Sequence, residues 1–275
     1  MKRLNLSVLW FPLVLLFMLI SNEPVNADIL EDIKFDYLVI GNGFEYMYYT
    51  EYEPETGTYT ETSVYNLITK FEGSVSVRQL FFDIKGVVPV YHGQVKEDWE
   101  RYGTVYQTNN LKYSWVRLDG NIGYSIYPWL NPYLGVRWTK SRQKRTNFIL
   151  SEPVNMESIE TCRALFATAG LKGFLKHSAQ WEFGYNFEYF MPVSAHTENT
   201  ALPGWKSYGK DGYSIGARVV ARYIYSPSVS LYYELSGEKT YWDGSSWIDY
   251  PGGSAKWPEN ETISLKYILG LAWVF

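Results

Sequence analysis

Alternation of apolar and polar residues is the feature that most constrains this chain. From residue 181 to residue 191 every second residue is apolar, and most residues between them are polar or glycine. Residues 116–126 and 263–275 follow the same period of two, and no stretch after Ala27 keeps a helical period. The chain is therefore predicted to form strands, each with one continuous apolar face.

Such strands could belong to a soluble sandwich or to a membrane barrel whose apolar face meets lipid. The polar faces carry charges mixed with Gly and Ser, which suits a polar barrel interior. Aromatic residues make up 18% of the chain, which also ends in Phe275 after alternating apolar residues. Aromatic girdles are typical of outer-membrane barrels. We therefore predict an all-β fold, a transmembrane antiparallel up-and-down β-barrel.

The first 27 residues have the composition of a secretory signal peptide. A basic start is followed by an apolar segment and by the small-residue end Val-Asn-Ala at 25–27. The apolar run at 4–20 is interrupted by polar residues and is shorter than the roughly 20 residues that a spanning helix needs. We expect 1–27 to be cleaved as a signal peptide, which leaves 28–275 as a β-barrel in the outer membrane of a Gram-negative bacterium.

Alternation and turn chemistry together predict ten strands, an even number that returns both ends of the chain to one side. The expected strands are 33–52, 63–74, 79–91, 111–127, 132–142, 161–176, 180–191, 213–225, 229–242 and 261–275. Short turns are expected at 128–131 and 226–228 on the periplasmic side. Long extracellular loops are expected at 92–110, 143–160, 192–212 and 243–260.

A barrel of about ten strands has a narrow interior that side chains fill. Ten charged residues are expected there, namely Arg117, Arg137, Arg218, Arg222, Lys266, Asp119, Glu182, Glu188, Glu234 and Glu238. Because buried charges must be paired, we expect a salt-bridge network that plugs the barrel. A small diffusion pore is the alternative, and it would conduct in planar bilayers.

Charge and composition exclude several classes of function. A net charge of −4 without a long basic run argues against a nucleic-acid partner. A single cysteine rules out an internal disulfide, and with only three histidines no structural zinc site of the Cys/His type is predicted. The Gly-rich segment 250–260 lacks the strand-to-helix context of a phosphate-binding loop. No metal and no cofactor are expected.

Three segments resemble the omptins, a family of outer-membrane proteases of Gram-negative bacteria. They are GQVKEDW at 93–99, DGNIGYSIYPWLNPYLGVRWTKSR at 119–142 and TAGLKG at 168–173. The predicted strand number and the length also agree with that family. The resemblance implies a barrel whose peptidase site holds a water between an Asp pair on one wall and an Asp-His pair on the other.

The residues at the matching positions depart from that pattern. The Asp pair reads Lys-Glu-Asp at 96–98, and the Asp-His pair reads Thr-Glu-Asn at 197–199. We therefore expect a surface-exposed, omptin-like barrel that presents loops for binding and has lost or altered the catalytic centre. The alternative is an active endopeptidase with a displaced site made of Asp98 and His196, with His92 nearby. The remaining interpretation is that these are solvated loop residues.

The resemblance also implies lipopolysaccharide binding on the outer wall. The matching positions are Trp138, Arg142 and Arg163, and Lys140 shares the outward face of Trp138 and Arg142. Arginine is suited to bidentate phosphate contacts, so the cluster is a candidate lipid A phosphate site. Snorkelling of these side chains to the membrane interface without a specific partner is the alternative.

The segments expected to form extracellular loops are rich in aromatic residues. These are Trp99, Tyr102, Tyr106, Trp205, Tyr208, Trp242, Trp247, Tyr250 and Trp257. Exposed rings at this density favour a surface that binds peptides, glycans or host molecules. The alternative is that the rings pack on one another to order long loops.

Overall fold

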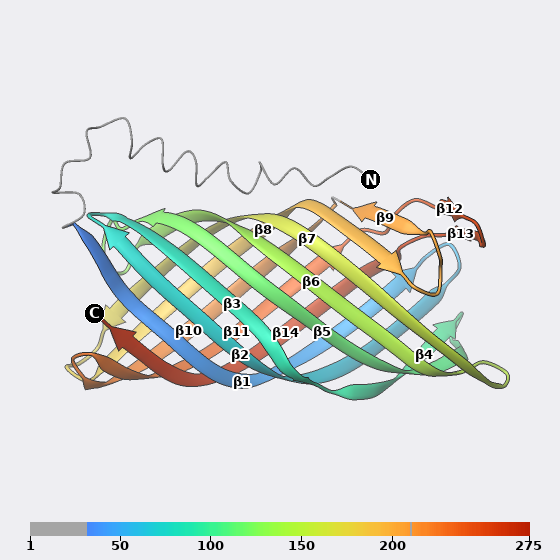
Figure 1. Ribbon diagram of the computed structural model, residues 1–275, viewed down its shortest axis with the longest axis horizontal. Coiled ribbons are helices and arrows are strands. Elements are labelled where there is room, and N and C mark those ends of the chain that lie inside the picture. The colour runs from blue at the N-terminus through green and yellow to red at the C-terminus, as the bar shows by residue number, and fades with distance from the viewer. Residues whose placement is uncertain (1–31, 210) are drawn as a thin grey trace.

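The computed structural model describes residues 32–209 and 211–275, which form a closed all-β barrel (Figure 1). The predicted signal peptide at 1–27 lies outside the described residues. Within the part of the chain that is described, no helix is long and apolar enough to cross a membrane.

Ten antiparallel strands form the wall. They are β1 (Ile33–Glu53), β2 (Thr58–Val77), β3 (Leu80–His92) continued by β4 (Gln94–Arg101), β5 (Thr104–Tyr124), β6 (Asn131–Ile149), β7 (Pro153–Lys176), β8 (Trp181–Asn199), β10 (Gly212–Ser226), β11 (Val229–Trp242) and β14 (Glu259–Val274). β3 and β4 count as one wall strand because both lie between β2 and β5. β1 pairs with both β2 and β14, which closes the sheet and confirms the predicted up-and-down barrel.

Three short strands lie at one end of this wall. β9 (Lys206–Gly209) pairs with β8, and β12 (Ile248–Tyr250) forms a hairpin with β13 (Gly253–Ala255). We call this end, where β8 connects to β10 and β11 to β14, the loop end. The opposite end, which holds the β2–β3 and β10–β11 turns and the last residues of β14, is the turn end (Figure 1).

Two of the segments predicted as long loops are strands. The segment 92–110 contains β4 and the start of β5, joined by a tight turn at 102–103, and the segment 143–160 continues β6 and β7 to a turn at 150–152. Tyr102 and Gly103 have φ of 50° and 77°, the left-handed conformation that a two-residue hairpin turn favours. The prediction was wrong because these strand ends carry polar residues on both faces, which removes the alternation.

An apolar band surrounds the half of the barrel nearer the turn end. Exposed apolar side chains in this band include Leu38, Ile40, Phe44, Leu67, Phe71, Ile84, Leu118, Ile122, Leu134, Val136, Phe183, Phe187, Val219, Leu231, Leu265 and Leu269. β1 has 21 residues and β7 has 24, whereas about 9–11 residues suffice for a strand to cross a bilayer. The strands therefore extend well beyond the band toward the loop end.

Ion pairs fill the interior at the height of the band. The cations Lys70, Lys85, Arg117, Arg137, Lys172, Arg218, Arg222 and Lys266 contact the anions Glu45, Glu72, Asp83, Asp119, Glu182, Glu188, Glu234 and Glu238. All ten charges predicted for the interior are among them, so the predicted salt-bridge network is confirmed. The two sets are equal in number, as a low-dielectric interior requires.

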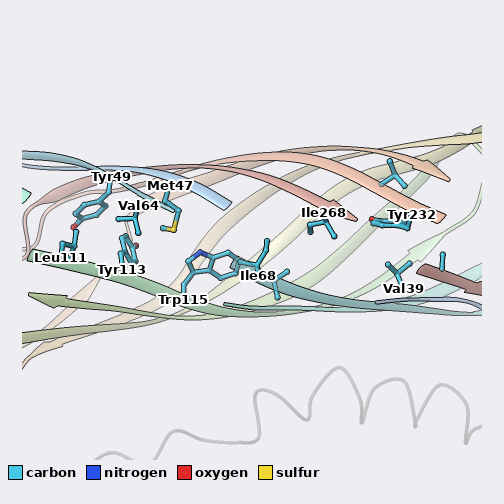
Figure 2. Close-up of a cluster of buried hydrophobic side chains, with 13 residues drawn as sticks. Val39, Met47, Tyr49, Val64, Ile68, Leu111, Tyr113, Trp115, Tyr232 and Ile268 are labelled. Atoms are coloured by element: carbon cyan, nitrogen blue, oxygen red, sulfur yellow. The ribbon is translucent and has the colours of Figure 1, made fainter. Parts of the chain in front are cut away.

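Apolar side chains pack against this network inside the barrel. Met47, Tyr49, Leu111, Tyr113 and Trp115 point into the interior toward the loop end, as Figure 2 shows. Each of them is less than a tenth exposed. The interior is thus packed with side chains contributed by strands from around the wall.

Candidate functional site

A pocket of about 360 Å³ opens at the loop end of the barrel, and we call it the mouth pocket. The ends of β1, β4, β6 and β7 contribute to its walls, together with the residues that follow β8 and β13. Trp99, Trp205, Trp247 and Trp257 all line it. The structure therefore brings four of the nine predicted loop aromatics to one cavity.

The other loop aromatics do not gather at this pocket. Tyr102 and Tyr208 are 79% and 72% exposed. Trp242 is buried, and its ring lies 5.7 Å from that of Trp257 and 5.4 Å from that of Phe166. Some rings therefore order the loop end by packing, as the alternative interpretation held, while the tryptophans of the mouth pocket also line a cavity.

Carboxylates outnumber cations in and directly below the mouth pocket. Arg145 donates hydrogen bonds to Glu97 at 2.7 and 3.1 Å, and its Nη2 lies 3.6 Å from Glu51 Oε2. Glu97 and Glu51 are 0% and 2% exposed. Lys256 Nζ lies 2.9 Å from Glu53, and Glu160 also lines the cavity. Four carboxylates thus face two cations.

This imbalance sets the ionisation of the cluster. Burial raises the pKa of Glu51 to about 8; Arg145 opposes the shift, and the carboxylates of Glu160 and Glu97 add to it. Burial also raises the pKa of Glu160, again against Arg145. Burial would raise the pKa of Glu97 as well, but its hydrogen-bonded Arg145 holds it below the usual value. At neutral pH, Glu51 is therefore mostly protonated and Glu97 is ionised.

The predicted catalytic residues Asp98 and His196 are not brought together. Asp98 lies on β4 with its side chain 43% exposed, 3.1 Å from Lys96 Nζ, and it accepts a hydrogen bond from Thr108 at 2.7 Å. His196 lies on β8, where its ring stacks on Tyr208 with centroids 4.9 Å apart. Three wall strands, β5, β6 and β7, separate β4 from β8, which corresponds to roughly 19 Å along the wall.

The inward positions on these two strands are one residue away from the predicted ones. On β4 the buried residue is Glu97, and next to His196 on β8 the buried residues are Ala195 and Thr197. Burial lowers the pKa of His92, as do Lys112 and Arg142, neither of which lines the mouth pocket. All three histidines of the sequence belong to the described residues, and none lines the mouth pocket. Among those residues, no group of three or more His, Cys, Asp or Glu side chains could hold a metal ion.

The four residues predicted to contact lipopolysaccharide form one outward patch. Trp138, Lys140, Arg142 and Arg163 are all exposed, and Lys140 on β6 stands directly opposite Arg163 on β7. The patch lies where the apolar band gives way to charged residues. Arg163 makes an ion pair with Glu198 at 3.2 Å, whereas Lys140 and Arg142 make no salt bridge with any described residue.

The fold is that of an outer-membrane β-barrel. The outer-membrane protease OmpT from Escherichia coli matches with a TM-score of 0.70 and 15% identity, covering 88% of this chain and 97% of that chain. This confirms the resemblance to the omptins at the level of the fold, and at such low identity it shows the fold alone. No family model and no curated protein matches the chain.

Two further outer-membrane barrels match less closely. OprG from Pseudomonas aeruginosa has a TM-score of 0.36 and 9% identity, covering 88% of this chain and 97% of that chain. The β domain of the Bordetella autotransporter BrkA has a TM-score of 0.38 and 11% identity, covering 86% of this chain and 100% of that chain.

Sequence reasoning missed the polar residues of the mouth pocket. Glu51, Arg145, Glu160 and Lys256 were not proposed as site residues, and Glu97 was noted only within the motif at 96–98. Arg145 and Glu160 fell in a segment that was expected to be a loop, where the inward face of a strand could not be assigned. One signal in the sequence could have indicated this site. Several acids lie near the predicted strand ends, and the cations predicted for the interior were already matched by other acids.

Proposed function

We propose that this protein is an integral outer-membrane barrel that presents its loop end at the cell surface and binds a cationic ligand in the mouth pocket. The orientation is supported by the short turns at the turn end, because bacterial outer-membrane barrels keep short turns in the periplasm and longer loops outside. The observation that carries the binding function is the excess of carboxylates over cations in a tryptophan-lined cavity.

The charge of the pocket favours a cation over a neutral or acidic ligand. Two ionisable carboxylates remain after Arg145 and Lys256 are each matched with one acid, and burial already drives Glu51 toward its neutral form. A cation entering the pocket would reduce this repulsion between like charges. Aromatic rings add a further attraction for positive charge. A cationic peptide, an aminated glycan or a cationic host molecule would meet this requirement.

Loss of the omptin chemistry is supported by the composition of the pocket. The omptin resemblance implies an Asp-His pair that provides the general base, and no histidine lines this cavity. An active endopeptidase is the second candidate, favoured by the OmpT-like fold. It would need Asp98 and His196 to act together, although the neighbouring residues Glu97, Ala195 and Thr197 are the buried ones on β4 and β8.

The test is performed on the refolded barrel with lipopolysaccharide present. The barrel is incubated with a mixed fluorogenic peptide library, and binding of arginine amide, neutral amides and acidic peptides is followed by tryptophan fluorescence. We expect no cleavage, binding of the cation, and weaker binding in Glu160→Gln. Cleavage that disappears in both His196→Ala and Asp98→Ala would establish the endopeptidase instead. Failure of every cationic ligand to bind would refute the binding function.

We also propose that Trp138, Lys140, Arg142 and Arg163 bind lipopolysaccharide. Lys140 and Arg142 are supported as the phosphate-binding cations, because Arg163 is already engaged by Glu198. The double variant Lys140→Ala/Arg142→Ala should bind lipopolysaccharide roughly tenfold more weakly, given about 0.5–1 kcal/mol per exposed charged contact. Lys239→Ala, an outward lysine on another wall, is the control. If the double variant and Lys239→Ala lost lipopolysaccharide affinity equally, the attraction would be nonspecific and the proposed site would be refuted.

A further inference from the structure

We propose that the cation bound in the mouth pocket is a quaternary ammonium group of the choline type. This inference rests on the proposed function and specifies the chemical class of its ligand. The pocket combines three properties that together select such a group: aromatic walls, more carboxylates than cations with two of the carboxylates already ion-paired, and buried indole donors.

The first property is the aromatic lining. Besides its four tryptophans, the cavity is lined by Tyr52 and Phe148, and Met156 adds a polarizable thioether. A cation gains most from the face of a tryptophan ring, and quaternary ammonium groups are recognised by aromatic cages because their methyl groups carry the charge to the rings. The mouth pocket, with a volume of about 360 Å³, is large enough for a small ammonium ligand.

The second property is that two of the four acids, Glu97 and Glu53, are already engaged by internal cations. Both oxygens of Glu97 accept from Arg145, and Lys256 lies within 2.9 Å of Glu53 and 3.4 Å of Glu55. A lysine or arginine side chain entering the pocket would have to replace its hydrogen bonds to water with bonds to protein acceptors. A quaternary ammonium has no N–H to satisfy, so the negative charge attracts it without requiring a free acceptor.

The third property is a pair of buried indole donors that lack a well-aligned hydrogen bond. The indole Nε1 atoms of Trp99 and Trp257 are buried and form no hydrogen bond of good geometry within the described part of the protein, although each lies beside a carboxylate, Glu97 for Trp99 and Glu160 for Trp257. Trp257 is only 4% exposed, and both rings line the cavity. A buried donor without a partner costs about 1–3 kcal/mol. An oxygen close to the ammonium, such as the hydroxyl or ester oxygen of choline, would accept from such a donor.

The two cations that line the mouth pocket each lie against one of its rings. Arg145 lies 5.2 Å from the centroid of Trp99, and Lys256 lies 6.0 Å from that of Trp247. Each cation therefore covers one face of its own ring. Trp247 is 49% exposed and donates its Nε1 proton to Glu55 at 2.6 Å, which holds this ring at the rim. Trp205 and Trp257, in contrast, are both buried.

The experiment compares choline with 3,3-dimethyl-1-butanol, the neutral isostere in which a carbon atom replaces the nitrogen. Binding to the refolded full barrel is measured by isothermal titration calorimetry and by tryptophan fluorescence. Choline should bind at least about tenfold more tightly than its isostere, which corresponds to roughly 1.4 kcal/mol from the positive charge. Choline should also bind more tightly than arginine amide, which carries the same charge with N–H donors.

Two variants localise the site. Trp247→Ala removes a half-exposed rim residue and should weaken choline binding, whereas Trp129→Ala removes a similarly exposed tryptophan at the turn end and should leave it unchanged. Tighter binding of arginine amide than of choline would overturn this inference while the proposed cationic function stands. Equal binding of choline and its isostere would also overturn it. Failure of choline and arginine amide alike would refute both proposals.

Discussion

Replacing Arg137 with methionine should destabilise the barrel by about 3–5 kcal/mol, the cost of removing one partner from a buried ion pair. Arg137 is 1% exposed and donates to Asp119 at 2.6 and 3.1 Å and to Glu238 at 3.0 Å. Asp119 retains Lys85 at 3.0 Å and Glu238 retains Arg117 at 2.6 Å, so each carboxylate keeps one partner. The loss should therefore fall at the lower end of that range.

The free energy of unfolding is measured by denaturant titration of the refolded barrel in detergent micelles, with tryptophan fluorescence as the readout. Arg78→Met is the matched control, because the Arg78–Asp32 pair is largely exposed and such pairs contribute about 0–1 kcal/mol. Adding Asp119→Asn to Arg137→Met restores equal numbers of cations and anions in the cluster and should recover part of the loss. If Arg137→Met matched the control, or if the second substitution deepened the loss, charge balance would not be what stabilises this interior.

Two further predictions concern the mouth pocket and the closure of the barrel. Because the pKa of Glu51 is raised to about 8 among Tyr49, Arg145, Glu97 and Glu160, the folded state holds its proton more tightly than the unfolded chain. The free energy of unfolding of the wild type should therefore fall relative to that of Glu51→Gln as pH rises from about 5 to 8, by at most about 1.4 kcal/mol per pH unit. Denaturant titrations of both proteins across this pH range measure the difference, and a difference that does not change with pH would contradict the prediction. Gly270→Val should prevent closure between β1 and β14, because a Cβ at that glycine would lie 2.4 Å from a backbone oxygen of β1. The gel mobility of unheated samples distinguishes the folded barrel from the unfolded chain. A variant that folds normally would show that the two strands can move apart to accept the side chain.

The sequence predicted the fold well wherever the chain lies within the apolar band. There the outside of each strand meets an apolar environment and the inside is polar, so inward and outward residues differ in kind. Beyond the band, both faces are polar, and segments such as 143–149 no longer alternate although they continue β6. Loss of alternation was therefore misinterpreted as the end of the strand.

The sequence placed His196 on the wrong face of its strand for a different reason, which is a single extra residue in β8. Leu165 pairs with Ser194 while Phe166 pairs with Pro192, so Val193 is left out of the ladder as a β-bulge. Such a bulge exchanges the two faces of the strand beyond it. Continued from the alternation at 181–191, an unbroken strand would have pointed His196 into the barrel. The bulge instead places Thr197 inside, and no pattern in the sequence marks its position.

The distribution of charge inside the barrel explains why the site lies at the mouth. At the height of the apolar band, cations and anions are equal in number, because the surrounding apolar environment makes an unpaired charge too costly. Near the loop end, water reaches the cavity and four carboxylates coexist with two cations, at the cost of a raised pKa at Glu51. An excess of acidic groups of this kind is tolerated only where solvent can screen their charge or a ligand can neutralise it. The excess acid and the tryptophans around it therefore make the mouth pocket the part of this molecule best suited to bind a charged ligand.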